Sequence, residues 1–291
     1  MAQNDRVTSL GAVQEAALAA FPLIRDEVSS LFSRYISDHT DISTTLRMLF
    51  KYQSERSQTV SFLISYGYAW DAEIILRSFY EVTAKILFVC LTQEDQKAGL
   101  MSEFWEGLGD INNRRTARKA EFSEQISRRS GNAYDEAVFS FLQNERFFPK
   151  DDSFSRTQRK RLKQKWSFSE IIQSLSATSG LQEINSLFHM YGMASHLAHA
   201  DCNALELMID RDIRETDERT LLERAHLCRI MSDQVGLAFF SAEALRRHFK
   251  AEFENKSLFS VVDRFFRLTK PVSDAFDETQ KEFYRSHGAK L

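Results

Sequence analysis

Apolar residues recur every three to four positions along nearly the whole chain, which is the spacing of amphipathic α-helices. The pattern predicts helices over residues 6–36, 42–66 and 69–91, with Asp41 as the N-cap of the second helix. Pro22 is expected to kink or divide the first helix, because proline removes a backbone hydrogen-bond donor. The third helix is apolar around most of its circumference and is therefore predicted to be central in a bundle.

The middle of the chain is more polar but still follows a helical period. Residues 93–129 and 132–146 are predicted helices. The segment that follows, FFPKDDSFSRTQRKRLKQKW at residues 147–166, contains Pro149, two adjacent aspartates and then a run of like charges. These features favour an irregular loop.

The last part of the chain returns to apolar periodicity. It predicts a short helix over residues 167–180 and long helices over 182–208 and 217–249. Pro271 is expected to separate two shorter helices at the C-terminal end. The fold class predicted by these elements is all-α, a multi-helix bundle with long central helices and a basic, partly irregular insertion.

The expected organisation is a single helical domain that spans residues 1–291. Its parts are a core over about 6–92 and 167–250, the basic insertion over about 93–166, and C-terminal helices over about 251–291. The composition agrees with long helices, since only 3 Pro and 10 Gly interrupt the chain, and 24 Phe supply a large core.

Charge and cysteine content narrow the compartment and the partners. A net charge of −3 argues against a wholly nucleic-acid-coating surface but allows a local basic patch. The three cysteines are far apart and read as packed, reduced thiols. No apolar run reaches about 18 residues, and the first residues lack a secretory pattern. We therefore expect a cytoplasmic protein that does not enter a membrane.

Four charged residues of alternating sign recur every fourth position within the apolar stretch 73–90: Glu73, Arg77, Glu81 and Lys85. Residues at this spacing are neighbours on a helix and can form ion pairs. One interpretation is a solvated ladder. The other is that Arg77 and Glu81, at the centre, are partly buried for a functional reason, while Glu73 and Lys85 are ordinary charged partners.

A second polar set lies in the segment HMYGMASHLAHAD, where Tyr191, Ser195 and His199 share one helix face. A histidine with a pKa near neutrality can exchange protons, and a neighbouring hydroxyl can fix its tautomer. The alternative is a structural polar seam between two helices. The pairs His196-x-x-His199 and Glu223-x-x-His226 are incomplete as metal motifs, so neither a metal nor a cofactor is expected.

Two basic runs fall in the insertion, and such clusters suit phosphate backbones. The alternative is a solvated helix face or a flexible loop. Trp166 or Phe168 is expected to stack on a base. The residues predicted to bind nucleic acid are Arg114, Arg115, Arg159, Lys160, Arg161, Lys163 and Trp166.

Three sequence pieces occur in order: LRSFYE in an apolar helix, KWSFSEIIQSLSATSG, and Tyr-x3-Ser-x3-His. Over residues 60–208 the chain resembles a bacterial all-helical family of unknown function with these motifs. The resemblance implies that Arg77, Ser78 and Glu81 from the first piece, Trp166 from the second, and Tyr191, Ser195 and His199 from the third are the site residues. A looser similarity links the chain to HEPN-type ribonuclease and toxin bundles. Their Arg-x4–6-His mark occurs here only about as often as chance predicts.

These observations lead to two functional hypotheses. The first is a metal-independent ribonuclease-like effector of a toxin or phage-defence system, in which Arg77 steadies the phosphate, His199 exchanges protons, and Tyr191 and Ser195 orient it. The second is a non-catalytic helical scaffold, sensor or partner subunit, in which the same residues form a buried network. RNA or another anionic partner is expected, together with a homo-oligomer or a partner protein.

Overall fold

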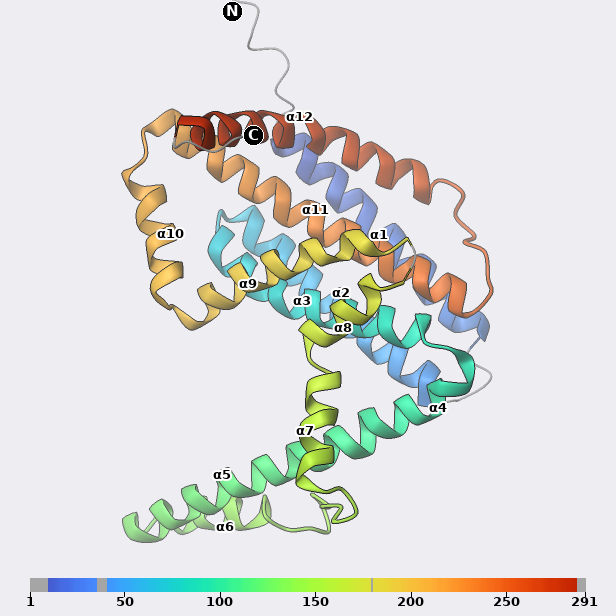
Figure 1. Cartoon of the computed structure of the whole chain (residues 1–291), viewed down its shortest axis with the longest axis vertical. Coiled ribbons are helices and arrows are strands. Elements are labelled where there is room, and N and C mark those ends of the chain that lie inside the picture. The colour runs from blue at the N-terminus through green and yellow to red at the C-terminus, as the bar shows by residue number, and fades with distance from the viewer. Residues whose placement is uncertain (1–9, 36–40, 179, 287–291) are drawn as a thin grey trace, which may run out of the picture. The chain divides into compact units, whose positions relative to one another are not determined.

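The structure is a computed structural model that describes residues 10–35, 41–178 and 180–286 (Figure 1). Helices make up most of these ranges, and they contain no strand, which confirms the predicted all-α fold class. One match to the Arg-x4–6-His mark ends at His39, and this residue lies outside the described residues.

The chain divides into two compact units. The first combines Met1–Leu91 with Ile172–Leu291, and the second is Thr92–Ile171. The sequence predicted one domain with an insertion at about 93–166, and the second unit occupies nearly that part of the chain. Because each unit is compact in itself, each is described separately below.

Most helices of the first unit are long. Helices that are antiparallel neighbours are joined by short connections. They are α1 (Leu10–Tyr35), α2 (Asp41–Ser65), α3 (Ala69–Leu91), α9 (Ser186–His199), α10 (Cys202–Ile213), α11 (Thr216–His248) and α12 (Leu258–Ser286). The helix α8 (Phe168–Ser176) begins in the second unit and ends in the first.

At the centre of the first unit, α3 packs against both α2 and α11 (Figure 1). Leu76, Phe79, Tyr80 and Ile86 of α3 have no exposed surface. This position is the one that the apolar circumference of the helix predicted. A polar seam also crosses this core, where Gln53 Nε2 donates to Thr83 Oγ1 at 2.6 Å and to Ser241 Oγ at 2.8 Å. Such a buried hydrogen-bonded network favours one register of the three helices.

Proline does not divide the helices in which it occurs. α1 continues through Pro22, and α12 continues through Pro271, so the prediction of two shorter C-terminal helices was wrong. Pro271 lies on the exposed side of α12, where water can satisfy the carbonyl that loses its helical partner. Packing of α12 against α1 and α11 supplies the stabilisation that keeps the helix whole.

The predicted long helix over 182–208 was also wrong, because it is two helices. The chain turns at Ala200, whose φ of 48° is left-handed. Asp201 then caps α10, since its side chain accepts a hydrogen bond from Ala204 N at 3.3 Å. This break turns α10 away from the axis of α9.

The second unit contains one long helix, with shorter helices before and after it in the sequence. They are α4 (Glu94–Ser102), a π-helical turn (Glu103–Gly107), α5 (Leu108–Ser130), α6 (Ala133–Phe141) and α7 (Arg156–Lys165). The loop predicted over 147–166 was wrong in its second half, which is α7. A capping box starts that helix, because Ser155 Oγ accepts from Gln158 N and the Gln158 side chain accepts from Ser155 N.

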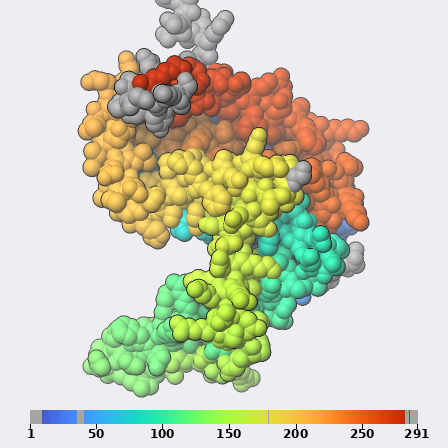
Figure 2. Space-filling view, in the orientation of Figure 1, coloured from blue at the N-terminus to red at the C-terminus, as the bar shows by residue number. Residues whose placement is uncertain are grey.

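The surface of the first unit includes α9 and α10, which lie uncovered in the space-filling view (Figure 2). On α10, Leu205, Ile209 and Ile213 are exposed at a spacing of four residues. The expected homo-oligomer or partner protein stays a prediction.

Over the described residues, every helix is too short or too polar to cross a membrane.

The cysteines differ from one another in burial. Cys90 and Cys228 are buried as predicted, whereas Cys202 is exposed at the start of α10. All three lie within the described residues, and no disulfide joins them.

Candidate functional site

A buried carboxylate joins α5 to α7 in the second unit. Asp110 is only 3% exposed. Its Oδ1 accepts from Arg114 Nε at 2.8 Å and from Asp151 N at 2.8 Å, and its Oδ2 accepts from Arg159 Nε at 2.6 Å. Burial alone would raise the pKa of Asp110, but these hydrogen bonds from Arg159, Asp151 and Arg114 hold it below its usual value. Asp110 is therefore charged and fixes the two helices to each other.

Close packing at Gly107 adds to this anchor. Leu162 is the buried residue of α7, and a Cβ atom at Gly107 would collide with its side chain. Gly107 therefore lets α7 approach the start of α5, as glycine does where two backbones come close.

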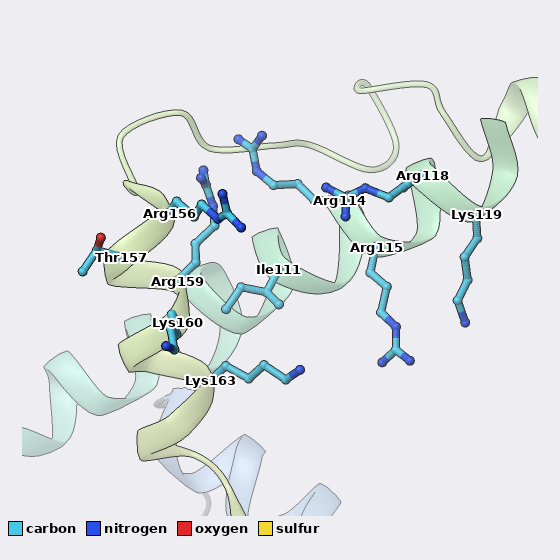
Figure 3. Close-up of a pocket in the computed structure, with 10 residues that line it drawn as sticks. All are labelled: Ile111, Arg114, Arg115, Arg118, Lys119, Arg156, Thr157, Arg159, Lys160 and Lys163. Carbon is cyan, nitrogen blue, oxygen red and sulfur yellow. The ribbon is translucent and has the colours of Figure 1, made fainter. Parts of the chain in front are cut away.

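Between α5 and α7 lies a cavity of about 910 Å³, which we call the basic groove. Eight of its ten lining residues are cationic, and the exceptions are Ile111 and Thr157. Figure 3 shows Ile111 in the middle, Lys163 extending from α7, and Arg115 and Lys119 extending from α5. The eight cationic residues are Arg114, Arg115, Arg118, Lys119, Arg156, Arg159, Lys160 and Lys163.

Most of these cations are not neutralised by the protein. Within the part of the chain that the structure describes, only Arg114 and Arg159 pair with carboxylates. The other six have no carboxylate within ion-pair distance there. Six uncompensated positive charges around one groove produce a local positive potential in a protein whose net charge is −3.

Five of the seven residues predicted to bind nucleic acid line the basic groove: Arg114, Arg115, Arg159, Lys160 and Lys163. Arg161 does not, because it lies on another side of α7, where it is exposed. Arg118, Lys119 and Arg156 also line the basic groove but were not among the residues predicted to bind nucleic acid. Their helical spacing relative to Arg114, Arg115 and Arg159 is the signal that would have included them.

The prediction that Trp166 or Phe168 stacks on a base needs correction. Trp166 is 5% exposed and Phe168 is 7% exposed. The indole Nε1 of Trp166 donates to Glu103 Oε2 at 3.2 Å, and its ring lies 5.1 Å from that of Phe104. Both rings are used in packing, so neither presents a free face to a ligand.

In the first unit, three of the predicted catalytic residues meet where α9 lies across α3 (Figure 1). Tyr191 Oη accepts from Arg77 Nη2 at 3.0 Å and donates to Glu81 Oε1 at 2.7 Å. The Arg77 guanidinium also lies over the Tyr191 ring, 5.1 Å from its centre. Burial and the bond to Glu81 raise the pKa of Tyr191, so its hydroxyl is neutral and donates. Arg77 and Glu81 are half-buried, in agreement with the sequence prediction.

The other two predicted catalytic residues lie further along α9. His199 is eight residues beyond Tyr191, which corresponds to about 12 Å along a helix axis. Ser195 is half-buried and His199 is exposed at the helix end. No hydrogen bond joins either of them to Arg77, Glu81 or Tyr191 among the described residues. The structure thus brings together three of the five residues, and the catalytic roles stay predictions.

His196, next to Ser195, has a different partner. Its Nδ1 lies 2.6 Å from Asp201 Oδ2, which lowers the pKa of that carboxyl. This contact ties the end of α9 to the start of α10. Over the residues that the structure describes, no three His, Cys, Asp or Glu side chains gather as metal ligands would.

The most buried charge in the first unit is one that sequence analysis treated as an ordinary surface partner. Glu73 has no exposed surface, whereas Arg77 and Glu81, which were predicted to be partly buried, are half-buried. Glu73 Oε2 accepts from Arg229 Nη2 and from His226 Nε2, the latter at 3.2 Å. Burial would raise the pKa of Glu73, but His226 and Arg229 hold it below its usual value.

Arg229 extends this buried charge cluster along α11. Its Nη1 donates to Asp233 Oδ2 at 2.7 Å and to Tyr80 Oη at 3.2 Å, and Tyr80 donates to Asp233 at 2.6 Å. Burial raises the pKa of Asp233. The cluster therefore links α3 to α11 through ion pairs that are almost out of reach of water.

His226 closes the other end of the buried charge cluster. Burial, together with the charges of Arg229 and Arg211, lowers its pKa, although the bond to Glu73 acts against this. Arg211 Nη1 lies 3.1 Å from His226 Nδ1, and its guanidinium stacks 4.1 Å from the centre of the Trp70 ring. A neutral His226 that donates from Nε2 to Glu73 Oε2 and accepts at Nδ1 from Arg211 uses both of its ring nitrogens. A helical face on α11 shared by His226, Arg229 and Asp233 was the only sequence signal for this cluster.

The fold and the groove together define an all-α protein with a charge-stabilised helical core and a basic groove on an inserted unit. The chain belongs to the family of unknown function DUF5677, whose model matches residues 44–218. This match confirms the resemblance to an all-helical family of unknown function and includes every motif on which it was based. Neither a curated protein nor a solved structure shows significant similarity to the chain.

Proposed function

We propose that this protein binds nucleic acid, with RNA as the expected ligand, through phosphate contacts in the basic groove. The observation that carries the proposal is the set of six cationic side chains that lack a carboxylate partner among the described residues, around a cavity of about 910 Å³. A site for one small anion needs two or three donors, so a groove with this many cations suits a ligand with several phosphates.

Release of counter-ions favours a polyanion as the ligand of the basic groove. Cations that repel one another in a groove are accompanied by small counter-anions, and a polyanion releases them when it binds. Arg114 and Arg159 are already held by Asp110, so they shape the groove, while Arg115, Lys160 and Lys163 are left to bind phosphate. Affinity is therefore expected to fall steeply as salt concentration rises.

The test is binding of a fluorescently labelled RNA of about 16 nucleotides to the full chain, followed by anisotropy. The double substitution Arg115→Glu with Lys163→Glu should weaken binding by at least about 100-fold at low salt, because it replaces two attractive contacts by repulsive ones. Arg161→Glu is the matched control, since it makes the same kind of charge change on α7 outside the groove. Equal effects of the control and the double variant would contradict the proposal.

Cleavage of RNA is the second candidate function, and the contact of Arg77, Glu81 and Tyr191 between α3 and α9 favours it. In this proposal Arg77 stabilises phosphate charge, and His199 exchanges the proton. Membership of a toxin or phage-defence system, which the family resemblance implied, belongs to this candidate.

The cleavage test uses RNA in the presence of a chelator, with wild type and two variants. His199→Ala should abolish cleavage without changing the melting temperature, because an exposed side chain contributes little to stability. Arg77→Lys should reduce cleavage as well, since lysine loses the planar fork. Absence of cleavage by wild type, with RNA binding intact, would leave the non-catalytic alternative, a helical scaffold, sensor or partner subunit.

A further inference from the structure

The cationic wall of the basic groove continues along α5 as a stripe that contains exposed apolar side chains. Arg115, Arg118, Phe122, Ile126 and Arg129 are separated by three or four residues, so they share one face of the helix. Ile111, which lines the groove, begins the same face. Phe122 therefore lies in line with the groove, about 6 Å beyond Arg118 along the helix axis.

Phe122 has an unusual degree of exposure for a phenylalanine. It is 67% exposed, and Ile126, one turn further, is 52% exposed. The buried residues of α5, which include Ala117, Ala120 and Ser127, occupy the opposite face, and α5 packs there within its own unit. Neighbouring exposed apolar side chains form a patch, and an exposed apolar patch rimmed by polar residues is typical of an interaction site.

We propose that the Phe122 ring is a stacking platform for an unpaired base, so that the ligand of the basic groove is single-stranded nucleic acid. This inference rests on the proposed binding function and deepens it. Phosphates lie against Arg115 and Arg118, and the next base stacks on Phe122. Arg129, seven residues after Phe122 on the same face, meets the backbone where the strand continues.

The alternation of cation, ring and cation distinguishes this stripe from an ordinary basic surface. A duplex offers phosphates but keeps its bases stacked inside, so it cannot use Phe122. A single strand offers both, and stacking on an aromatic side chain is tolerant of sequence because every base has a π-face. The stripe should thus prefer single strands to duplexes, without a preference for base sequence.

The experiment compares three labelled ligands of equal length on the full chain: single-stranded RNA, an abasic phosphodiester backbone, and a blunt-ended RNA duplex. Wild type should bind the single strand more tightly than the abasic backbone. Phe122→Ala should weaken binding to the single strand by about 5- to 100-fold, the range for one stacked base, and leave the other two ligands unchanged. Phe122→Trp should retain or improve single-strand binding.

Two further variants test whether the ring itself matters. Phe122→Leu keeps an apolar side chain of similar size and should lose affinity like Phe122→Ala, because it lacks a π-face. Phe62→Ala removes another exposed phenylalanine, on α2, and should have no effect. Since Phe122 is exposed, all variants should keep the wild-type helical content by circular dichroism.

The outcomes separate the two proposals. If Phe122→Ala binds the single strand like wild type, or if Phe122→Leu does, the stacking platform is wrong. In that case loss of binding in Arg115→Glu with Lys163→Glu still supports the groove. If wild type binds none of the three ligands, the proposed function itself fails.

Discussion

In the buried charge cluster between α3 and α11, Arg229 meets two carboxylates, those of Glu73 and Asp233, and Glu73 has no exposed surface. In the basic groove between α5 and α7, six cations meet no carboxylate in the described part of the chain, and most of them are exposed. The same types of side chain are thus paired within the protein in one region and left without a carboxylate partner in the other.

This difference has an energetic meaning. Charges taken out of water lose hydration, and the loss of one partner leaves the other unpaired in the core. The buried charge cluster should therefore respond to substitution through folding stability. Solvated cations at a surface contribute little to stability, but a polyanion can use them, so the basic groove should respond through binding.

Asp110 combines both properties. Its carboxylate is buried, like Glu73, but its partners Arg114 and Arg159 line the basic groove. It therefore gives an intermediate case, in which one substitution should change both the stability of the second unit and the affinity of the groove.

The largest expected effect comes from Glu73→Gln, which removes the charge that faces Arg229 and His226. We expect the free energy of unfolding in urea to fall by about 3 to 5 kcal/mol, the usual loss when a buried ion pair loses one partner. Glu55→Gln, in an exposed pair with Lys51, is the matched control and should change it by less than about 0.5 kcal/mol. A loss as small as that of the control would show that the cluster does not support the fold.

Asp110→Asn should have the next largest effect. The amide keeps the shape of the side chain but gives up charge-assisted bonds to Arg114 and Arg159, at about 2 to 3 kcal/mol of unfolding free energy. RNA affinity should fall as well, because α7 is no longer fixed to α5. Unchanged stability together with unchanged affinity would show that Asp110 supports neither the second unit nor the basic groove.

His226→Gln should reduce the pH dependence of stability. Because burial lowers the pKa of His226 in the folded protein, the unfolded chain binds the proton more readily, and wild type loses stability as the pH falls below about 6.5. The opposite contribution of Asp233, whose pKa is raised, is common to both proteins. Urea unfolding at several pH values between neutrality and pH 5 should give a flatter profile for the variant, and parallel profiles would contradict it.

The smallest effect on stability is expected for Lys163→Ala in the basic groove, at less than about 0.5 kcal/mol. The same change should lower the slope of log affinity for single-stranded RNA against log salt concentration by about 0.7, the value for one phosphate contact. Binding titrations over a range of salt concentrations check this. A fall in the unfolding free energy of more than about 1 kcal/mol, with an unchanged slope, would contradict the comparison between the two regions.

Much of the fold could be predicted from the amino-acid pattern because helical periodicity is local. The all-α class, the bounds of α2, α3 and α11 to within a few residues, and the central position of α3 follow from apolar spacing alone. The errors arose where tertiary contacts override local signals. The helix α7 carries a run of like charges, yet Asp110 and the Ser155 capping box stabilise it.

The candidate site was only partly predictable for a related reason. Spacing could place Arg77 and Glu81 on one helix face and Tyr191 on another, and the two faces do meet. Spacing could not tell that Glu73 is more buried than either, because its partner Arg229 lies 156 residues away in sequence. It also could not tell that the Trp166 side chain is buried whereas the Phe122 side chain is exposed.

Residue type and spacing are sufficient to predict the helices, their apolar faces, the family and the two basic runs. Which charges are paired with a carboxylate depends instead on tertiary contacts. Desolvation and ion pairing depend on how distant helices dock, and this docking is what separates the buried charge cluster from the basic groove.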